Sequence, residues 1–173
     1  TRREIEQGMQ VEALQICSEL ERTTVEMPYG LALYHPEWHQ GVVGILASRI
    51  KERFYRPVIA FAPAGDGILK GSGRSIHGLH MRDALERIDS QNPGLIMKFG
   101  GHAMAAGLSL EEARFDEFRL RFAELVGEWL DSSQLEGVIW SDGELAMDEL
   151  SLPTAELLRD GGPWGQAFPD PTF

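Results

Sequence analysis

Cysteine is nearly missing from this chain of 173 residues, because Cys17 is the only one. A single cysteine excludes disulfides within the chain and every zinc site built from cysteines. It fits a reducing compartment, so we expect a cytoplasmic protein. No run of about 18 apolar residues occurs, which excludes a membrane-spanning helix from this sequence. We also expect no signal peptide, since no charged segment followed by an apolar one opens the chain.

Motifs for nucleotide binding and for hydrolysis are missing as well. Neither GxxxxGK[ST] nor GxGxxG occurs, and no cluster of Asp and His has the spacing of a two-metal site. No Ser-His-Asp arrangement can be assembled either. A nuclease or phosphatase needs metal-bound water or another strong nucleophile. We therefore expect this chain to hold a substrate without cleaving it, and to bind no metal ion.

Basic residues are few, since 16 Lys and Arg accompany 27 Asp and Glu and give a formal net charge of −11. This balance argues against nucleic acid as a ligand, because proteins that bind nucleic acid usually carry a basic surface. The acidic excess is confined to residues 111–173, which hold four basic and 15 acidic side chains, whereas residues 1–110 hold 12 of each. A local cluster of cations in the neutral part can still attract an anion.

The spacing of apolar residues predicts an α/β fold. Residues 31–34 and 58–62 are short apolar runs typical of strands, and residues 40–54 between them have helical spacing. Strand, helix and strand within about 32 residues indicate a βαβ unit with a parallel strand pair. The glycine-containing turn at residues 64–67 then predicts a hairpin with an antiparallel strand over residues 68–73.

Further elements follow from the same patterns. We expect helices over residues 1–22, 81–90, 111–130 and 148–160, a strand at residues 108–110, and a strand or hairpin over residues 137–147. The predicted architecture is a mixed sheet that contains the βαβ unit and is flanked by helices, up to about residue 130. A fragment of something else is expected after it. The two ends of the sequence are typical of a piece cut from a longer protein.

The string KGSGRS at residues 70–75 is the first candidate site. Its two glycines permit a ligand to approach the backbone closely. Arginine can hold a phosphate through two parallel hydrogen bonds, and serine hydroxyls add further bonds. The same string also suits a plain glycine-rich turn with an exposed arginine. The residues alone leave both interpretations open.

The string FGGHAMAAG at residues 99–107 is the second candidate, because it surrounds one imidazole with small residues. His102 could donate a hydrogen bond to a phosphate, move a proton or bind a metal. The alternative is tight backbone packing around a histidine whose hydrogen bonds are satisfied locally.

The segment HPEWH at residues 35–39 is the third candidate. His35 and His39 are four residues apart, but Pro36 and a strand-to-helix junction prevent the single helical face of a zinc site. We instead predict a helix N-terminus, with Trp38 as a packing anchor and His39 near the positive end of the helix dipole. Surface or helix-capping roles are expected for the remaining two, His77 and His80.

Three strings, in this order, resemble the RecJ family of bacterial exonucleases specific for single-stranded DNA, in the DHH phosphoesterase superfamily. They are HPEWHQGVVGILASRIKERFYRPVIAF, KGSGRS and FGGHAMAAGLSL, and they are similar to the family's DHH-associated domain. The leading TRREIEQGMQVEAL resembles the helix that connects this domain to the catalytic domain. SDGELAMDEL and GPWGQAFPDPTF resemble the opening of an oligonucleotide-binding (OB) domain. The resemblance implies a connecting helix over residues 1–26, the DHH-associated domain over 27–132 and a truncated OB-type segment over 133–173.

The resemblance implies the substrate-binding part of a 5′→3′ exonuclease that acts in DNA repair and recombination. The two-metal site, with Mn²⁺ or Mg²⁺, would lie on an absent catalytic domain. The implied partners are single-stranded DNA and, beyond it, single-strand-binding protein and helicases, and we expect a monomer. His102 would support catalysis from the cleft wall. The residues expected to hold DNA phosphate are Lys70, Ser72, Gly73, Arg74, Ser75, Gly100, Gly101 and His39.

Two other functions stay open at this point. The chain could be a non-catalytic module that binds DNA or a protein partner. It could also belong to a DHH-family phosphodiesterase of small nucleotides, which would share GGHA but need neither the helix that follows WH nor the OB-like tail. The leading interpretation requires Arg74 and His102 to converge in space, so coordinates that place them on opposite sides would contradict it.

Overall fold

The computed structural model describes residues 2–23, 26–138, 141–165 and 168–173. The chain divides into two compact units, residues 1–136 and 137–173. The division falls beyond the predicted boundary at residue 132, because the short 3-10 helix η2 (Ser132–Leu135) buries Leu135 in the core of the first unit.

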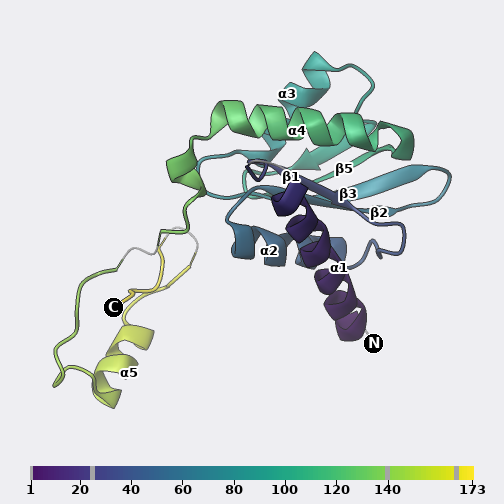
Figure 1. The fold of residues 1–173 in the computed structure, drawn as a ribbon. Coiled ribbons are helices and arrows are strands. Elements are labelled where there is room, and N and C mark those ends of the chain that lie inside the picture. Colours follow the sequence, from purple (N-terminus) through teal and green to yellow (C-terminus); the bar gives the residue numbers. More distant parts are fainter. Residues whose placement is uncertain (1, 24–25, 139–140, 166–167) are drawn as a thin grey trace. The chain divides into compact units, whose positions relative to one another are not determined.

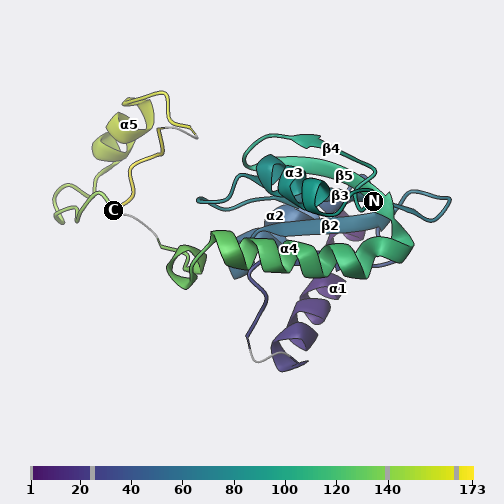
Figure 2. The same ribbon diagram turned by 90° about the horizontal axis from the view of Figure 1, so that it is seen from above.

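A five-stranded mixed sheet with the order β1-β2-β3-β5-β4 forms the centre of the first unit. Its strands are β1 (Leu31–Tyr34), β2 (Val58–Pro63), β3 (Ile68–Arg74), β4 (Lys98–Gly101) and β5 (Ala105–Glu111). β1 and β2 are parallel and all other neighbours are antiparallel, which confirms the predicted mixed α/β fold with its βαβ unit and hairpin. β4 lies at one edge of the sheet (Figure 2).

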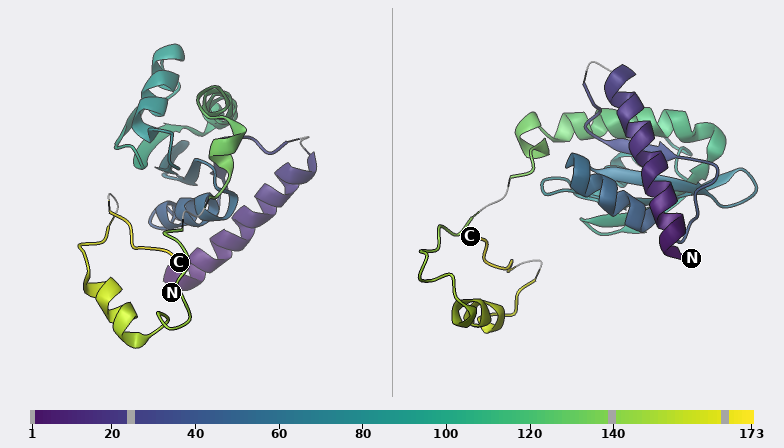
Figure 3. Two further views of the ribbon diagram at one scale, coloured as in Figure 1. Left: turned by 90° about the vertical axis from the view of Figure 1, so that its left-hand side faces the viewer. Right: turned by 60° about the horizontal axis from the view of Figure 1, so that its bottom comes forward.

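Helices cover both faces of this sheet (Figure 1). α1 (Arg2–Thr23) and α2 (Val43–Phe54) lie on one face, and the view from that side shows α1 crossing α2 (Figure 3, right). α3 (Met81–Gln91) and α4 (Phe115–Trp129) lie on the other face. The strands therefore contribute alternate side chains to two cores. Among the described residues, no helix combines the length and the apolar character needed to cross a bilayer.

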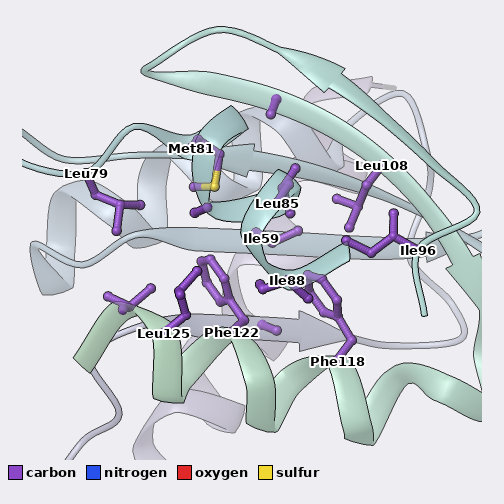
Figure 4. Close-up of a cluster of buried hydrophobic side chains, with 14 of the residues drawn as sticks. Ile59, Leu79, Met81, Leu85, Ile88, Ile96, Leu108, Phe118, Phe122 and Leu125 are labelled. Carbon is purple, nitrogen blue, oxygen red and sulfur yellow. The ribbon is translucent and has the colours of Figure 1, made fainter. Parts of the chain in front are cut away.

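The core beneath α3 and α4 is rich in aromatic contacts (Figure 4). Phe118 and Phe122 of α4 stack with ring centroids 6.0 Å apart, and Phe61 of β2 meets Phe118 edge-on at 5.5 Å. Ile59 of β2 and Leu108 of β5 complete this layer. Burying one such side chain fully stabilises the fold by about 1.5–3 kcal/mol. The predicted apolar stripe of α4 is thus the surface that attaches the helix to the sheet.

Several elements differ from the prediction: α2 begins at residue 43 rather than 40, β5 at residue 105 rather than 108, and α5 (Leu152–Asp160) at residue 152 rather than 148. Residues 98–101 form β4, because their backbone pairs with β5, although a glycine-rich segment has a low strand propensity. The helix predicted from residue 111 begins only at Phe115, because β5 extends to Glu111 and the 3-10 helix η1 (Glu112–Arg114) follows it.

The second unit contains α5 (Leu152–Asp160), no residue of which is buried. Trp164 stacks on Phe168 with ring centroids 4.7 Å apart, and its indole N–H donates to the carbonyl oxygen of Leu158 at 2.8 Å. The strand or hairpin predicted over residues 137–147 is wrong for the described part of that range, which is coil and turn. Asp142 donates a single backbone hydrogen bond to the carbonyl oxygen of Thr172 at 2.7 Å, but no strand ladder forms among the described residues of this range. Residues 139–140 lie outside the described part.

Candidate nucleic-acid interface

The two glycine-bordered strings lie side by side at one end of the sheet. Arg74, the last residue of β3, is paired with Ala105, the first residue of β5. The turn that holds His102 leads directly into β5, and the backbone N–H of His102 donates to the carbonyl oxygen of Ala105 at 2.8 Å. A hydrogen bond between the two strings runs from the N–H of Ser75 to the carbonyl oxygen of Met104 at 2.9 Å. The backbones of Arg74 and His102 therefore lie at the same end of the sheet.

One face of strands β3, β5 and β4 is exposed in part, at Lys70, Lys98, Gly100 and Gly107. Side chains alternate along a strand, and Leu69 faces the core beneath α3 and α4. Lys70, Ser72 and Arg74 therefore face the other side. A groove of about 330 Å³ lies over part of this side, lined among others by Lys70, Lys98, Gly100 and Gly107. Ser72 and Arg74 do not line the groove; they lie beside it, against Gly44 of α2. We call this side of the three strands the open face and define it by Lys70, Ser72 and Arg74 of β3, Gly107 and Ser109 of β5, and Lys98 and Gly100 of β4. Ser109 itself is buried, with 5% exposure.

The register of the strands arranges the open face in rows. One row aligns Lys70, Ser109 and Lys98, and the next aligns Ser72, Gly107 and Gly100. An added Cβ would meet nothing within 4 Å at Gly100, and only the carbonyl oxygen of Gly71, at 3.8 Å, at Gly107. Glycine weakens a strand by roughly 0.5–1 kcal/mol. Packing in this fold does not require either glycine, and together they form a flat strip that a ligand backbone can approach closely.

Two candidate residues of the first string, Gly73 and Ser75, face the core and have a structural role rather than a binding one. An added Cβ at Gly73 would meet the side chain of Met81 at 3.2 Å, on the face opposite to the open face. Ser75 is 1% exposed, and its hydroxyl donates to the carbonyl oxygen of Leu79 at 2.7 Å. Both residues brace the end of β3 from the core side, and neither offers a polar side-chain group to a ligand on the open face.

Arg74 provides a fixed guanidinium group at the end of β3. Its Nη1 donates to the hydroxyl of Ser72 at 3.1 Å and to the carbonyl oxygen of Gly73 at 2.8 Å. Arg114 and Arg121 pair with acidic side chains, whereas Arg74 has no ion-pair partner within the described ranges. A guanidinium that is held in place without a carboxylate can accept an anion through two parallel hydrogen bonds.

The N-terminal turn of α2 lies against the same two side chains. An added Cβ at Gly44 would be 3.0 Å from Nη2 of Arg74 and 3.1 Å from Oγ of Ser72. The helix begins later than predicted because residues 39–42 form a hydrogen-bonded turn, and its N-cap residue Val42 offers no side-chain acceptor. The positive end of the helix dipole is thus close to the guanidinium group.

The two candidate histidines have different surroundings. His39 is exposed in the turn before α2, and its Nδ1 accepts a hydrogen bond from the N–H of Gly41 at 3.0 Å. His102 is exposed in the turn between β4 and β5. The preceding Gly101 has a φ of 147°, and an added Cβ there would meet the carbonyl oxygen of Ala105. This turn therefore requires glycine before the imidazole.

Other predicted roles have clear outcomes. Trp38 is a packing anchor, as predicted, with 3% exposure, and its Nε1 donates to the carboxylate of Glu12 at 2.8 Å. His80 caps α3, because its Nδ1 accepts from the N–H of Asp83 at 3.3 Å. In the part of the chain that the structure describes, no group of three His, Cys, Asp or Glu residues could hold a metal ion.

Sequence reasoning missed three parts of this site, Lys98, Gly107 and Gly44, although it did predict the helix N-terminus near His39. Lys98 went unnoticed because residues 98–101 were not expected to be a strand. Gly44 carried a usable signal, since glycine inside a helix costs about 1 kcal/mol relative to alanine and often marks a close approach. Nothing local distinguished Gly107 from the other glycines of its string.

Comparisons with known proteins agree with this fold. Residues 27–128 match the family model described as the DHHA1 domain. The chain is 79% identical over 173 residues to the single-stranded-DNA-specific exonuclease RecJ of Dickeya dadantii, and 70% identical over 173 residues to that of Escherichia coli. Both alignments cover 100% of this chain and 30% of the relative. The chain thus spans about 30% of the length of these curated relatives.

Two solved structures of RecJ from Thermus thermophilus are also similar. They were determined in complex with Mg²⁺ and with Mn²⁺, and they superpose with TM-scores of 0.72 and 0.73 at 29% sequence identity. The superpositions cover 98% of this chain and 24% and 23% of the solved chains. The predicted fold class is confirmed by this likeness.

Proposed function

Because this chain belongs to the DHHA1 domain family, we propose that it is the part of a single-stranded-DNA-specific exonuclease that holds the DNA. Relatives with that name align with every residue of the chain, which spans 30% of their length. We propose that cleavage takes place on polypeptide outside this chain, which alone does not cleave DNA. Residues 1–26 would connect the two parts, and residues 133–173 would open an OB-type domain.

The observation that carries this proposal is an arginine without an ion pair beside a strip of glycine. Cations supply most of the affinity for a nucleic-acid backbone, and Lys70, Lys98 and Arg74 are the cations of the open face. Gly100 and Gly107, which lack side chains, leave room for a sugar-phosphate backbone to lie directly over the strands. This combination suits a strand held by its phosphates rather than by its base sequence.

The acidic balance of the chain does not oppose this function. The excess of acidic residues lies in residues 111–173. Within the first unit, the acidic side chains of α4 lie on the side of the sheet opposite to the open face. The groove over the open face is therefore a locally cationic site on an acidic protein.

Each candidate residue receives a role in this proposal. Arg74 and Ser72 hold a phosphate beside the N-terminal turn of α2, with His39 nearby. Lys70 attracts a neighbouring phosphate, and Gly100 with Gly101 shapes the strip and its turn. Gly73 and Ser75 support the end of β3 from the core side. His102 donates a hydrogen bond to a phosphoryl oxygen, which would stabilise the charge that develops during cleavage.

We also propose Mn²⁺ or Mg²⁺ as the cofactor of the full-length protein, in keeping with the metals in the similar solved structures. The described residues of this chain do not fit such an ion, since they include no suitable ligand group. The full-length protein would be a cytoplasmic monomer that degrades DNA in the 5′→3′ direction in repair and recombination. Single-strand-binding protein and helicases would be its partners.

Binding of a labelled single-stranded oligonucleotide to the full-length protein, measured by fluorescence anisotropy, tests the proposal. Arg74→Ala should weaken binding by about 1.5–3 kcal/mol, the range for a hydrogen bond to a charged group. The slope of log affinity against log salt concentration should also become shallower by about one phosphate contact. Arg82→Ala, an exposed arginine on the first turn of α3, is the matched control and should bind like the wild type. Wild-type affinity in Arg74→Ala would reject the proposal.

A further inference from the structure

The loop between β1 and α2 is anchored to two other elements. Trp38 is buried among side chains of α1 and α2, and its Nε1 donates to Oε2 of Glu12 on α1 at 2.8 Å. Gln40 Nε2 donates to the carbonyl oxygen of Pro63, at the end of β2, at 2.9 Å. Glu12 Oε2 also lies 3.8 Å from Nδ1 of His35. One carboxylate of α1 therefore contacts two residues of this loop.

The anchored loop leads directly into the candidate phosphate site. Only the turn at residues 39–42 separates Trp38 from the first residue of α2. Gly44, in the first turn of that helix, lies against the side chains of Arg74 and Ser72. A displacement of the indole would therefore be transmitted through one short turn to the part of α2 that borders the guanidinium group.

We infer that Glu12 and Trp38 are positioning residues for the phosphate site. α1 holds the loop through the hydrogen bond between these two side chains, and the loop holds the N-terminal turn of α2 beside Arg74. This inference rests on the proposed function of the open face. Glu12 acts through Trp38 and the helix rather than by contact with the ligand. Without the Glu12 carboxylate, the partly buried indole N–H of Trp38 would have no acceptor. Leaving a buried donor unsatisfied costs free energy, so the loop would shift to a position where the N–H finds another partner.

Steady-state cleavage of a single-stranded oligonucleotide by the full-length protein tests this inference. Glu12→Ala and Trp38→Phe should each raise KM about 3- to 10-fold at unchanged kcat, because lost positioning weakens ground-state and transition-state binding alike. Glu12→Gln keeps an acceptor for the indole N–H and should restore most of the lost affinity. Gln15→Ala, an exposed position on the same helix, is the matched control and should keep the wild-type KM.

Coupling to Arg74 separates a positioning role from a merely structural one. If Glu12 acts through the phosphate site, adding Glu12→Ala to Arg74→Ala should change KM little. An equal effect of Glu12→Ala in both backgrounds would overturn the inference. If Arg74→Ala alone raises KM whereas Glu12→Ala and Trp38→Phe do not, only this inference fails. If Arg74→Ala leaves KM unchanged, the proposed function fails together with it.

Discussion

At the scale of single residues, two adjacent glycines serve different purposes. Gly101 has a φ of 147° and no room for a Cβ, whereas an added Cβ at Gly100 would meet nothing within 4 Å. We expect Gly101→Ala to lower the free energy of unfolding by about 1–3 kcal/mol, the cost of a strained backbone. Gly100→Ala should not lower it and should raise it by up to about 1 kcal/mol, because alanine loses less backbone freedom on folding than glycine does. Urea denaturation of both variants measures the difference, and equal losses would contradict this assignment.

The same pair separates folding from binding. Gly100→Ala places a methyl group on the glycine strip of the open face, so it should weaken the binding of single-stranded DNA while the urea midpoint stays at or above that of the wild type. Undiminished affinity would show that no ligand backbone approaches the strip closely.

Cys17 should make the stability of the first unit depend on pH. Burial, with a smaller contribution from Glu21, raises the pKa of its thiol from 9.0 to about 12. The folded chain keeps the thiol proton to a higher pH than the unfolded chain does. The stability that the protonated thiol contributes is therefore complete below about pH 9 and is lost as the pH rises toward 12. Cys17→Ala should therefore show a smaller decline in the free energy of unfolding over that window, measured by urea denaturation. A decline as steep as that of the wild type would contradict it.

At the scale of elements, α4 shows how an apolar stripe translates into stability. Phe118 is fully buried, whereas Leu120, two residues further along the helix, is 55% exposed. Phe118→Ala should lower the free energy of unfolding by about 3–5 kcal/mol, since it removes a large side chain from a packed core. Leu120→Ala, the control on the same helix, should change it by no more than about 0.5 kcal/mol. Similar losses in chemical denaturation would be incompatible with this packing.

The strands show where element prediction succeeds and where it fails. Residues 31–34 and 58–62 were predictable because a strand covered on both faces must be apolar throughout. β4 was not predictable, since its sequence KFGG has little strand propensity and it is ordered by pairing with β5. Residues 137–147 show the converse error, because their pattern suited a strand, whereas their described residues form no strand ladder. Strand formation depends on distant residues.

At the scale of the whole molecule, the buried core of the first unit is complete in itself. Every buried hydrophobic residue of the described chain lies between Met9 and Leu135. A shortened chain of residues 1–136 should therefore unfold in a single transition with the free energy of that unit in the full 173-residue chain. Circular dichroism during urea denaturation measures both. A loss of several kcal/mol on removal of residues 137–173 would contradict this autonomy.

The sequence by itself determined the chemical groups of the site, the helices with strong apolar periodicity and the resemblance to a family. Charge, hydroxyl and imidazole groups are properties of single residues, and periodicity extends over a few turns, so both can be read locally. Only the tertiary structure decided which glycines face the groove and that α2 begins beside Arg74. It also decided that the Ser75 hydroxyl is hydrogen-bonded inside the core and does not face a ligand. These outcomes depend on strand register and on packing neighbours that are remote along the chain, which no local pattern encodes.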